Sequence, residues 1–341
     1  MAATFSAVTA YSLAEWKQWY ENDEKLSNYI NLLEQDNPIL AHALFKKGNI
    51  TDGFKGKIIT SLPTVYFRRL YQGVSYSKAG IATVQEPTRQ LAARWGVDID
   101  EMRLYEGANE QNAFRMQQGA LFIEAMKQKA VQQLFYGSPS SDADQLRGLA
   151  AHYPTSSSAN VIDAGGSGSD NTSIWGVVWG DNDFHGFFPK NMPMGIQHED
   201  LGKYDAEDGD GKKYRAVGDE WKWNLGFFNS DWRSVVRICN IDVSNLDIVA
   251  TNDSDYIDLR KLTIKAKNKI PSGKRGRMKW YCSEAVMNAL EIQAGQHPTQ
   301  GAGTGNVHLR YGEWENSKEI LKMHGKPVFQ CDGLLETESA I

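Results

Sequence analysis

A cationic segment in the second half of the chain is the most concentrated source of possible chemistry. Nine lysines and arginines lie between positions 260 and 279 without one acidic residue: Arg260, Lys261, Lys265, Lys267, Lys269, Lys274, Arg275, Arg277 and Lys279. Such local charge can contact phosphates. No aromatic residues alternate with the charges to stack bases. We therefore favour a solvated loop, or a patch that meets an acidic surface of another subunit.

Two glycine-rich loops match nucleotide-binding or nucleophile motifs only in part. Residues 165–169 read Gly-Gly-Ser-Gly-Ser, with Ser where a nucleophile elbow has its last Gly. Residues 301–306 begin like a dinucleotide fingerprint but end in Asn306 and do not follow a strand. Neither loop has the Lys-Ser/Thr pair of a P-loop, so we expect no nucleotide cofactor.

Signals for metal or thiol chemistry are equally weak. The acidic turn at 205–211 places Ala206 where a calcium loop needs an acidic ligand. His185 and His198 lie near several acidic residues but lack the spacing of a zinc motif. Cys239, Cys282 and Cys331 are odd in number and have no C-x-x-C pair, which indicates neither a disulfide framework nor a zinc site and favours a reducing compartment. The apolar neighbours of Cys239 and Cys282 predict buried, unreactive thiols. The residues thus indicate a protein that is not an enzyme and has no cofactor or metal.

Composition is that of a globular protein with a sizeable core. The 341 residues are 41% hydrophobic and 23% charged, which is enough for two average domains or one large one. A formal net charge of -5 excludes a protein that wraps nucleic acid by charge alone. No apolar segment approaches the roughly 20 residues of a membrane span. No basic residue precedes Lys17, which argues against a secretory signal.

The first hundred residues predict an arm and a hairpin. Residues from Tyr11 to Lys47 are rich in helix formers, and apolar residues recur at helical spacing from Leu13 to Leu33. Ser12 and Glu15 form a capping box at the start. The segment predicts a helical arm or an ordinary core helix. From Phe54 to Val97, β-rich segments at 58–60, 64–67 and 81–84 predict a long two-stranded hairpin. Its apolar residues are too few for a core, so a neighbour must hold it. Its cations are candidate contacts between subunits: Arg68, Arg69, Lys78, Arg89 and Arg94.

Residues 108–136 predict one continuous helix, about 40 Å long, that ends at Gly137. Gly119 in its middle weakens it by about 1 kcal/mol relative to alanine. After a polar loop at 153–172, the remaining expectations are strands at 173–179, 184–188, 221–228, 232–243 and 327–331, an exposed turn at 205–213, a helix at 283–293 and a glycine-rich loop at 300–306.

Several short segments together form a recognisable set: Leu62–Arg68, Gln72–Val74, Ser77-Lys78, Phe135–Gly137, Gly148–Ala150, Asn160–Gly166, Ser169–Trp175, Asp231–Arg233 and Arg237–Asp242. This set resembles the major capsid proteins of tailed bacteriophages, in particular the epsilon-fifteen-like proteins of short-tailed phages. The resemblance is good over residues 62–243 and less secure at the ends.

The resemblance implies an α+β subunit of the Hong Kong 97 type. On this mapping, residues 1–55 are an N-terminal arm and 56–97 an extended loop that reaches over neighbours. Residues 98–243 are a peripheral domain with a spine helix at 108–136. An axial domain at 244–320 packs around the capsomer axis, and 321–341 return to the peripheral domain or a sheet edge. The order of the predicted strands after the spine helix is also compatible with the permuted connection of some short-tailed-phage capsid proteins.

The implied function is self-assembly, through hexamers and pentamers, into the icosahedral head shell of a virion. The implied partners are further copies of the chain, scaffolding, portal and cement or decoration proteins, and double-stranded DNA on the inner face, with no membrane. Assembly would take place in the host bacterial cytoplasm. Some relatives cross-link a loop-tip Lys to an Asn, but here no matching Asn and Glu can be assigned, so Lys78 is expected to form an inter-subunit salt bridge.

Two alternatives follow from the residues alone. The chain could be a nucleic-acid-binding protein that acts through residues 260–279, or an enzyme with a pocket around His185 and His198. Neither alternative accounts for the arm, the hairpin and the long helix together.

Overall fold

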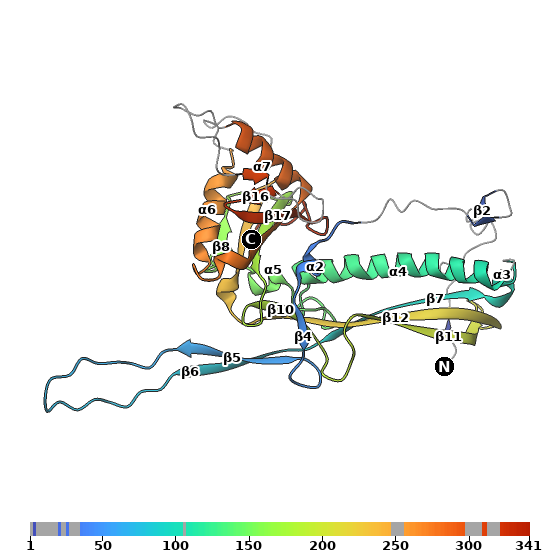
Figure 1. Cartoon of the computed structure of the whole chain (residues 1–341), viewed down its shortest axis with the longest axis horizontal. Helices are drawn as coiled ribbons and strands as arrows, with labels where there is room; N and C mark the ends of the chain where they lie inside the picture. Colours follow the sequence, from blue (N-terminus) through green and yellow to red (C-terminus); the bar gives the residue numbers. More distant parts are fainter. Residues whose placement is uncertain are drawn as a thin grey trace. The chain divides into compact units, whose positions relative to one another are not determined.

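The computed structural model describes residues 35–104, 107–246, 256–296 and 321–341, together with four short strands outside these ranges (Figure 1). The four are β1 (Ala3–Thr4), β2 (Tyr20–Glu21), β3 (Lys25–Leu26) and β15 (Leu309–Tyr311). The helices are α2 (Ile39–His42), α3 (Ile99–Met102), α4 (Ala108–Tyr136), α5 (Leu149–His152), α6 (Leu259–Lys269) and α7 (Glu284–Gln296), with the 3-10 turns η1 (Trp232–Ser234) and η2 (Arg275–Arg277). The other strands are β4 (Phe45–Lys47), β5 (Phe54–Ser61), β6 (Gly80–Glu86), β7 (Arg89–Asp98), β8 (Val161–Asp163), β9 (Asn171–Val178), β10 (Phe184–Phe188), β11 (Ile196–Glu207), β12 (Lys213–Asn229), β13 (Val235–Asp242), β14 (Met278–Cys282), β16 (Leu321–Met323) and β17 (Lys326–Gln330).

The chain forms two compact units, each built from segments that are distant in the sequence. The first unit comprises residues 1–34, 90–130 and 194–224. The second unit comprises residues 35–89, 131–193 and 225–341.

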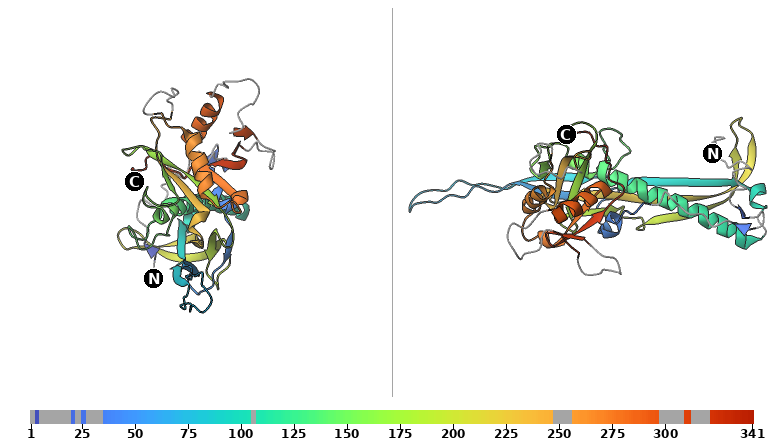
Figure 2. Two further views of the ribbon diagram at one scale, coloured as in Figure 1. Left: turned by 90° about the vertical axis from the view of Figure 1, so that its left-hand side faces the viewer. Right: turned by 90° about the horizontal axis from the view of Figure 1, so that it is seen from above.

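In the first unit, most of α4 packs on a sheet. β11 and β12 form an antiparallel ribbon, and β7 also pairs with β12 (Figure 2). Trp95, Phe114 and Trp221 are buried between helix and sheet. A Cβ at Gly119 would lie 3.1 Å from Cζ2 of Trp221, so the glycine that weakens the helix makes room for this ring.

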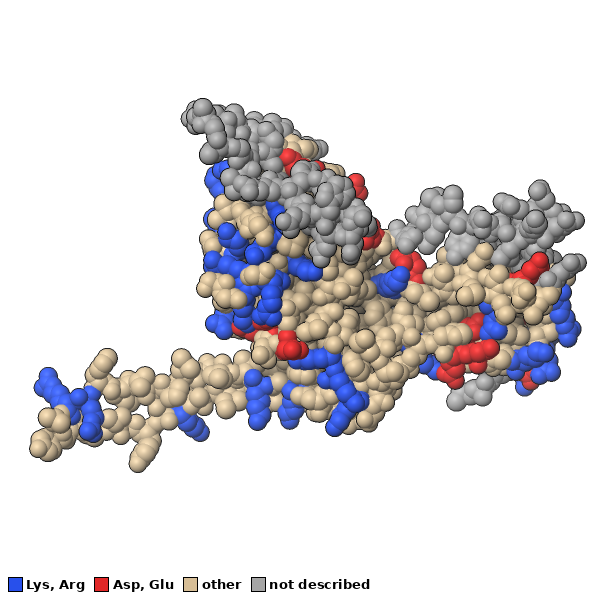
Figure 3. All heavy atoms as spheres, viewed as in Figure 1, with Lys and Arg blue, Asp and Glu red and all other residues tan. Residues whose placement is uncertain are grey.

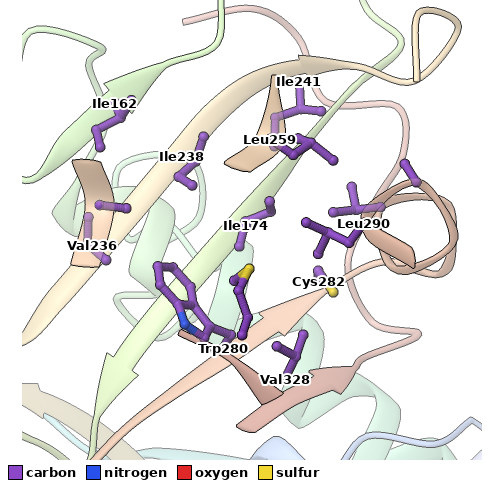
Figure 4. Close-up of a cluster of buried hydrophobic side chains, with 14 of the residues drawn as sticks. Ile162, Ile174, Val236, Ile238, Ile241, Leu259, Trp280, Cys282, Leu290 and Val328 are labelled. Carbon is purple, nitrogen blue, oxygen red and sulfur yellow. The ribbon is translucent and has the colours of Figure 1, made fainter. Parts of the chain in front are cut away.

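In the second unit, a seven-stranded sheet has the order β15-β16-β17-β14-β9-β13-β8. Its central strands β9 and β13 are buried almost throughout, because α6 and α7 contribute to the same apolar core (Figure 4). Ile174, Ile238, Trp280 and Leu290 meet in this core. The sheet takes strands from both sides of position 243, where the sequence predicts a boundary between two domains.

The C-terminal segment is tied to this sheet by backbone and side-chain hydrogen bonds. The backbone groups of Glu338 and Asn171 bond to each other, and the backbone N–H of Ile341 donates to the Asn240 side chain. Arg237, buried beneath the segment, donates to the Glu338 carboxylate. The last residues are therefore part of the fold.

Most of the predicted elements are confirmed. α4 has the bounds predicted for the long helix, and α7, β9, β10, β13 and β17 lie where helix and strands were expected. The predicted exposed turn at 205–213 is the turn between β11 and β12. β8 was missed inside the predicted polar loop at 153–172, because its three residues are too few for a periodic signal.

Three predictions for the first hundred residues are wrong. A continuous helix over 11–47 is wrong for the described residues of that range, which form β2, β3, the single-turn helix α2 and β4. The rest of the range, with Ser12 and Glu15, lies outside the described residues. Residues 64–67 are irregular and exposed rather than a strand. The hairpin ends at Glu86, and β7 pairs with β12 instead, since its alternate side chains fit the core of the first unit.

The cationic segment is also not a loop. Residues 259–269 form α6, and residues 278–282 form the core strand β14. Apolar side chains at helical spacing bury one side of α6, a weak signal that the charges obscured. The predicted glycine-rich loop at 300–306 lies outside the described residues. Among the described helices, none combines the length and the apolar character needed to cross a membrane.

Candidate assembly surfaces

The loop that joins β5 to β6 exposes an unusual number of large apolar side chains. The two strands pair from Phe54 and Glu86 to Ser61 and Gly80, and residues 62–79 continue without regular structure. Phe67 and Tyr71 are fully exposed. The other large apolar residues of the loop are also more than a third exposed: Leu62, Val65, Tyr66, Leu70, Val74 and Tyr76. Exposed apolar surface of this extent marks a site of protein–protein contact.

All the charged side chains of the same hairpin are cationic. Residues 53–85 contain no acidic residue, and their cations are Lys55, Lys57, Arg68, Arg69 and Lys78. Nη1 of Arg68 donates to the backbone oxygen of Gln72 at 3.4 Å. Within the described part of the chain, Arg68, Arg69 and Lys78 form no salt bridge, and Figure 3 shows the cations near the end of the loop. Their charges are available to carboxylates of another subunit.

Arg89 and Arg94, the other two predicted contacts, are held within their own chain. Nη2 of Arg89 donates to the backbone oxygen of Ala143 at 2.7 Å. Nη2 of Arg94 forms a salt bridge of 3.0 Å with Glu220 in the first unit. The sequence could not distinguish these two from the loop cations, because their partners lie more than fifty positions away.

An aromatic cluster anchors the base of the hairpin. Phe54 contacts the rings of His185 at 5.0 Å and Phe228 at 4.8 Å between centroids. His185 is fully buried, and burial together with the charge of Lys46 lowers its pKa to about 4. A neutral ring that packs against phenylalanines is a structural residue, so His185 does not fit the metal site considered from the sequence.

His198 belongs to a charged cluster in the first unit. Its Nε2 lies 2.7 Å from Oδ1 of Asp219, which also receives a hydrogen bond of 2.6 Å from Arg115. Asp200 completes the cluster with a 2.9 Å salt bridge to Arg115. These groups line one end of a cleft of about 590 Å³ beside α4. Throughout the described residues, no group of three His, Cys, Asp or Glu is placed to hold a metal ion.

The nine cations of residues 260–279 have different surroundings. Lys274 bridges Asp183 and Asp231, and Arg277 binds Asp183 at 2.8 Å. Although burial opposes it, hydrogen bonds from Arg233 and Lys274 lower the pKa of Asp231 to about 2. These cations link the loops around β10 and η1, whereas those on α6 lie at the surface.

The cysteines are buried and form no disulfide. Burial raises the pKa of Cys239 to about 11 and that of Cys331 to about 12, and it also raises the pKa of Cys282. Thiols in this state are poor nucleophiles. The predicted burial of Cys239 and Cys282 is confirmed, and Cys331 is buried as well.

The fold defines a class of protein. It is the mixed α+β fold of Hong Kong 97-type phage capsid subunits. A structure of bacteriophage Epsilon15 is 27% identical in sequence, with a TM-score of 0.75 over 98% of each chain. The bacteriophage JBD30 capsid is 7% identical, with a TM-score of 0.50 over 90% of this chain and 95% of that one, and it shows the fold alone.

The chain belongs to the family of the major capsid protein GP7, whose profile matches residues 21–341. No curated protein matches it. As a major capsid protein it forms the shell of a phage capsid, and the virion is its location. Nothing in these matches favours the alternative of a nucleic-acid-binding protein acting through residues 260–279. Membership in a family of structural capsid proteins indicates a role that is not enzymatic.

Proposed function

We propose that the chain assembles through hexamers and pentamers into an icosahedral head shell that encloses double-stranded DNA. Scaffolding, portal and cement or decoration proteins take part, and assembly takes place in the cytoplasm of the host bacterium. The family match supports the shell, and the exposed loop at 62–79 supports the mode of assembly. Within one subunit, the exposed aromatic rings of this loop have no core to enter, so they gain burial only in contact with other copies.

The extended loop clamps neighbouring subunits by two kinds of contact. Phe67 and Tyr71 bury apolar surface on the neighbour, while Arg68, Arg69 and Lys78 pair with its carboxylates. Each subunit is held by several others, so the stability of the shell grows by multivalency. In this proposal, the arm lies in residues 1–55, the peripheral domain carries α4 and the β11–β12 ribbon, and the axial domain is built on the seven-stranded sheet.

Assembly of full-length subunits tests this function. Negative-stain electron microscopy and light scattering should show closed shells, or five- and six-fold capsomers, for the wild-type protein. The variant Phe67→Ser/Tyr71→Ser should melt like wild type, because both side chains are fully exposed, yet assemble at least tenfold less efficiently. Met192→Ser/Met194→Ser removes exposed apolar side chains elsewhere and serves as the control.

Two results would contradict the proposal. A wild-type protein that stays monomeric or dimeric, also with co-expressed phage proteins, would exclude assembly into a shell. Equal assembly of the loop variant and the control would exclude the loop as the clamp.

A further inference from the structure

The helix α6 carries cations whose charges the described residues balance with a single salt bridge, between Lys261 and Asp258. Leu259, Thr263, Ala266 and the following Ile270 are buried and fix which side of the helix faces the core. Asp258 caps the first turn by accepting a hydrogen bond from the backbone N–H of Lys261. The exposed positions follow at steps of three and four residues: Lys261, Ile264, Lys265, Asn268 and Lys269. We call the cations of this helix and Arg275 beyond it the α6 face: Arg260, Lys261, Lys265, Lys267, Lys269 and Arg275.

The charge of the α6 face is only weakly compensated within the chain. Lys261 pairs with Asp258 at 3.2 Å, but its side chain is 73% exposed, and such surface pairs contribute little. Lys269 donates to a backbone oxygen, and Arg275 donates to the backbone oxygens of Ile270 and Asn268. Over the described ranges, Arg260, Lys265, Lys267, Lys269 and Arg275 form no salt bridge. Nearby Lys274 and Arg277, in contrast, are held by Asp183.

The spacing of these charges suits a linear polyanion. Lys261, Lys265 and Lys269 follow one another at four-residue steps, so they form a row on one side of the helix with about 6 Å of rise between neighbours. In Figure 3, blue side chains gather over the part of the second unit where Figure 1 draws α6. A duplex carries one phosphate charge per about 1.7 Å of its axis, so every lysine of the row can find a phosphate.

The composition of the α6 face favours phosphates over an acidic protein surface. The buried centres of protein–protein interfaces are enriched in aromatic residues and depleted in lysine. Here the one large apolar side chain among the exposed positions of α6 is Ile264, at 39% exposure, and the helix has no aromatic residue. The α6 face therefore provides positive charges but little apolar surface. Positive charges are sufficient to contact the phosphates of nucleic acid.

We propose that the α6 face lies on the inside of the shell and contacts the phosphate backbone of the enclosed DNA without reading its sequence. This inference rests on the proposed function, because it requires that the shell contains DNA. Contacts through a few lysines per subunit are individually weak and sensitive to salt. The packaged DNA is thus held against the wall without being fixed in register.

The salt dependence of DNA binding by unassembled full-length subunits tests the inference. Fluorescence anisotropy measures binding to a labelled 30-base-pair duplex over a series of salt concentrations. Lys261→Gln/Lys265→Gln/Lys269→Gln should flatten the slope of log K against log [salt] by about 2.7, since each lost phosphate contact contributes about 0.9. Lys203→Gln/Lys212→Gln/Lys213→Gln, on the β11–β12 ribbon, makes the same change in net charge at exposed lysines and should leave the slope unchanged.

Three results would overturn the inference: an unchanged slope in the α6 variant, an equal loss in the control, or displacement of the duplex by poly-glutamate as readily as by unlabelled DNA. The last result would indicate an acidic protein partner instead. Electron microscopy of the same proteins under assembly conditions separates the two proposals. Shells that form while the slope does not change would exclude the α6 contact alone. Wild-type subunits that form no shells, also with co-expressed phage proteins, would exclude the proposed function, even if they bind DNA.

Discussion

Replacing Glu338 with alanine removes the only carboxylate that the described residues place in a salt bridge with the buried Arg237. Arg237 is 4% and Glu338 8% exposed. Oε2 of Glu338 accepts hydrogen bonds from Arg237 at 2.8 Å and from Ser173 at 2.6 Å, and Oε1 accepts one from the Tyr136 hydroxyl at 2.6 Å. Breaking a buried pair by removing one partner leaves an uncompensated charge and costs about 3–5 kcal/mol.

Urea unfolding of unassembled subunits, followed by tryptophan fluorescence, measures this cost. Trp175 is a suitable reporter because the Arg237 guanidinium lies 5.0 Å from its ring centroid. The expected loss is a large share of the roughly 5–15 kcal/mol that stabilise most folded proteins. Glu338→Gln keeps the shape of the side chain but removes the charge of the group that accepts these hydrogen bonds. A smaller loss of unfolding free energy, about 1.5–3 kcal/mol, is therefore expected.

The control is Glu336→Ala, which removes an equal charge two positions away. Glu336 is exposed and accepts one hydrogen bond of 3.2 Å, from the backbone N–H of Ala285, so its loss should cost less than about 1 kcal/mol. The double variant Arg237→Met/Glu338→Leu should recover part of the stability, because no buried charge is left unpaired. Equal losses for Glu338→Ala and Glu336→Ala would refute the reasoning.

Three further predictions concern other parts of the fold. Gly119→Leu should lower the free energy of unfolding in urea by about 1–3 kcal/mol, because the new side chain would overlap the Trp221 ring. An unchanged stability would mean that the Trp221 ring moves aside without cost. The pKa of His185 is lowered from 6.5 to about 4, so the stability that its neutral ring contributes is complete above pH 6.5 and is lost as the pH falls toward 4. His185→Phe should therefore flatten the pH dependence of the urea midpoint between these values, and an unchanged slope would contradict it. Ellman's reagent should modify the native protein far more slowly than the urea-unfolded protein, and rapid modification of one thiol would contradict the burial of Cys239, Cys282 and Cys331.

Elements with local signals could be predicted from the amino-acid sequence. The long helix at 108–136 has helical periodicity over its whole length and a stop at Gly137. The strands around Ile174 and Ile238 are continuous apolar segments, so local composition is enough to predict them. The β-rich segments near Ile58 and Ile81 are also local signals, and the few apolar residues around them predicted a hairpin that needs a partner.

Contacts between residues that are far apart in the sequence could not be predicted, because they depend on how the whole chain packs. The sequence placed residues up to Val97 in the hairpin. Their pairing with β12 instead depends on a core in which Trp95 meets Trp221, more than a hundred positions away. The same holds for Arg237 and Glu338, whose pairing requires the C-terminal segment to return to β9 and β13. For the cationic segment, charge conceals the apolar side of α6 in the sequence. Once α6 packs against the sheet, Lys274 pairs with Asp183, whereas the lysines of α6 remain at the surface.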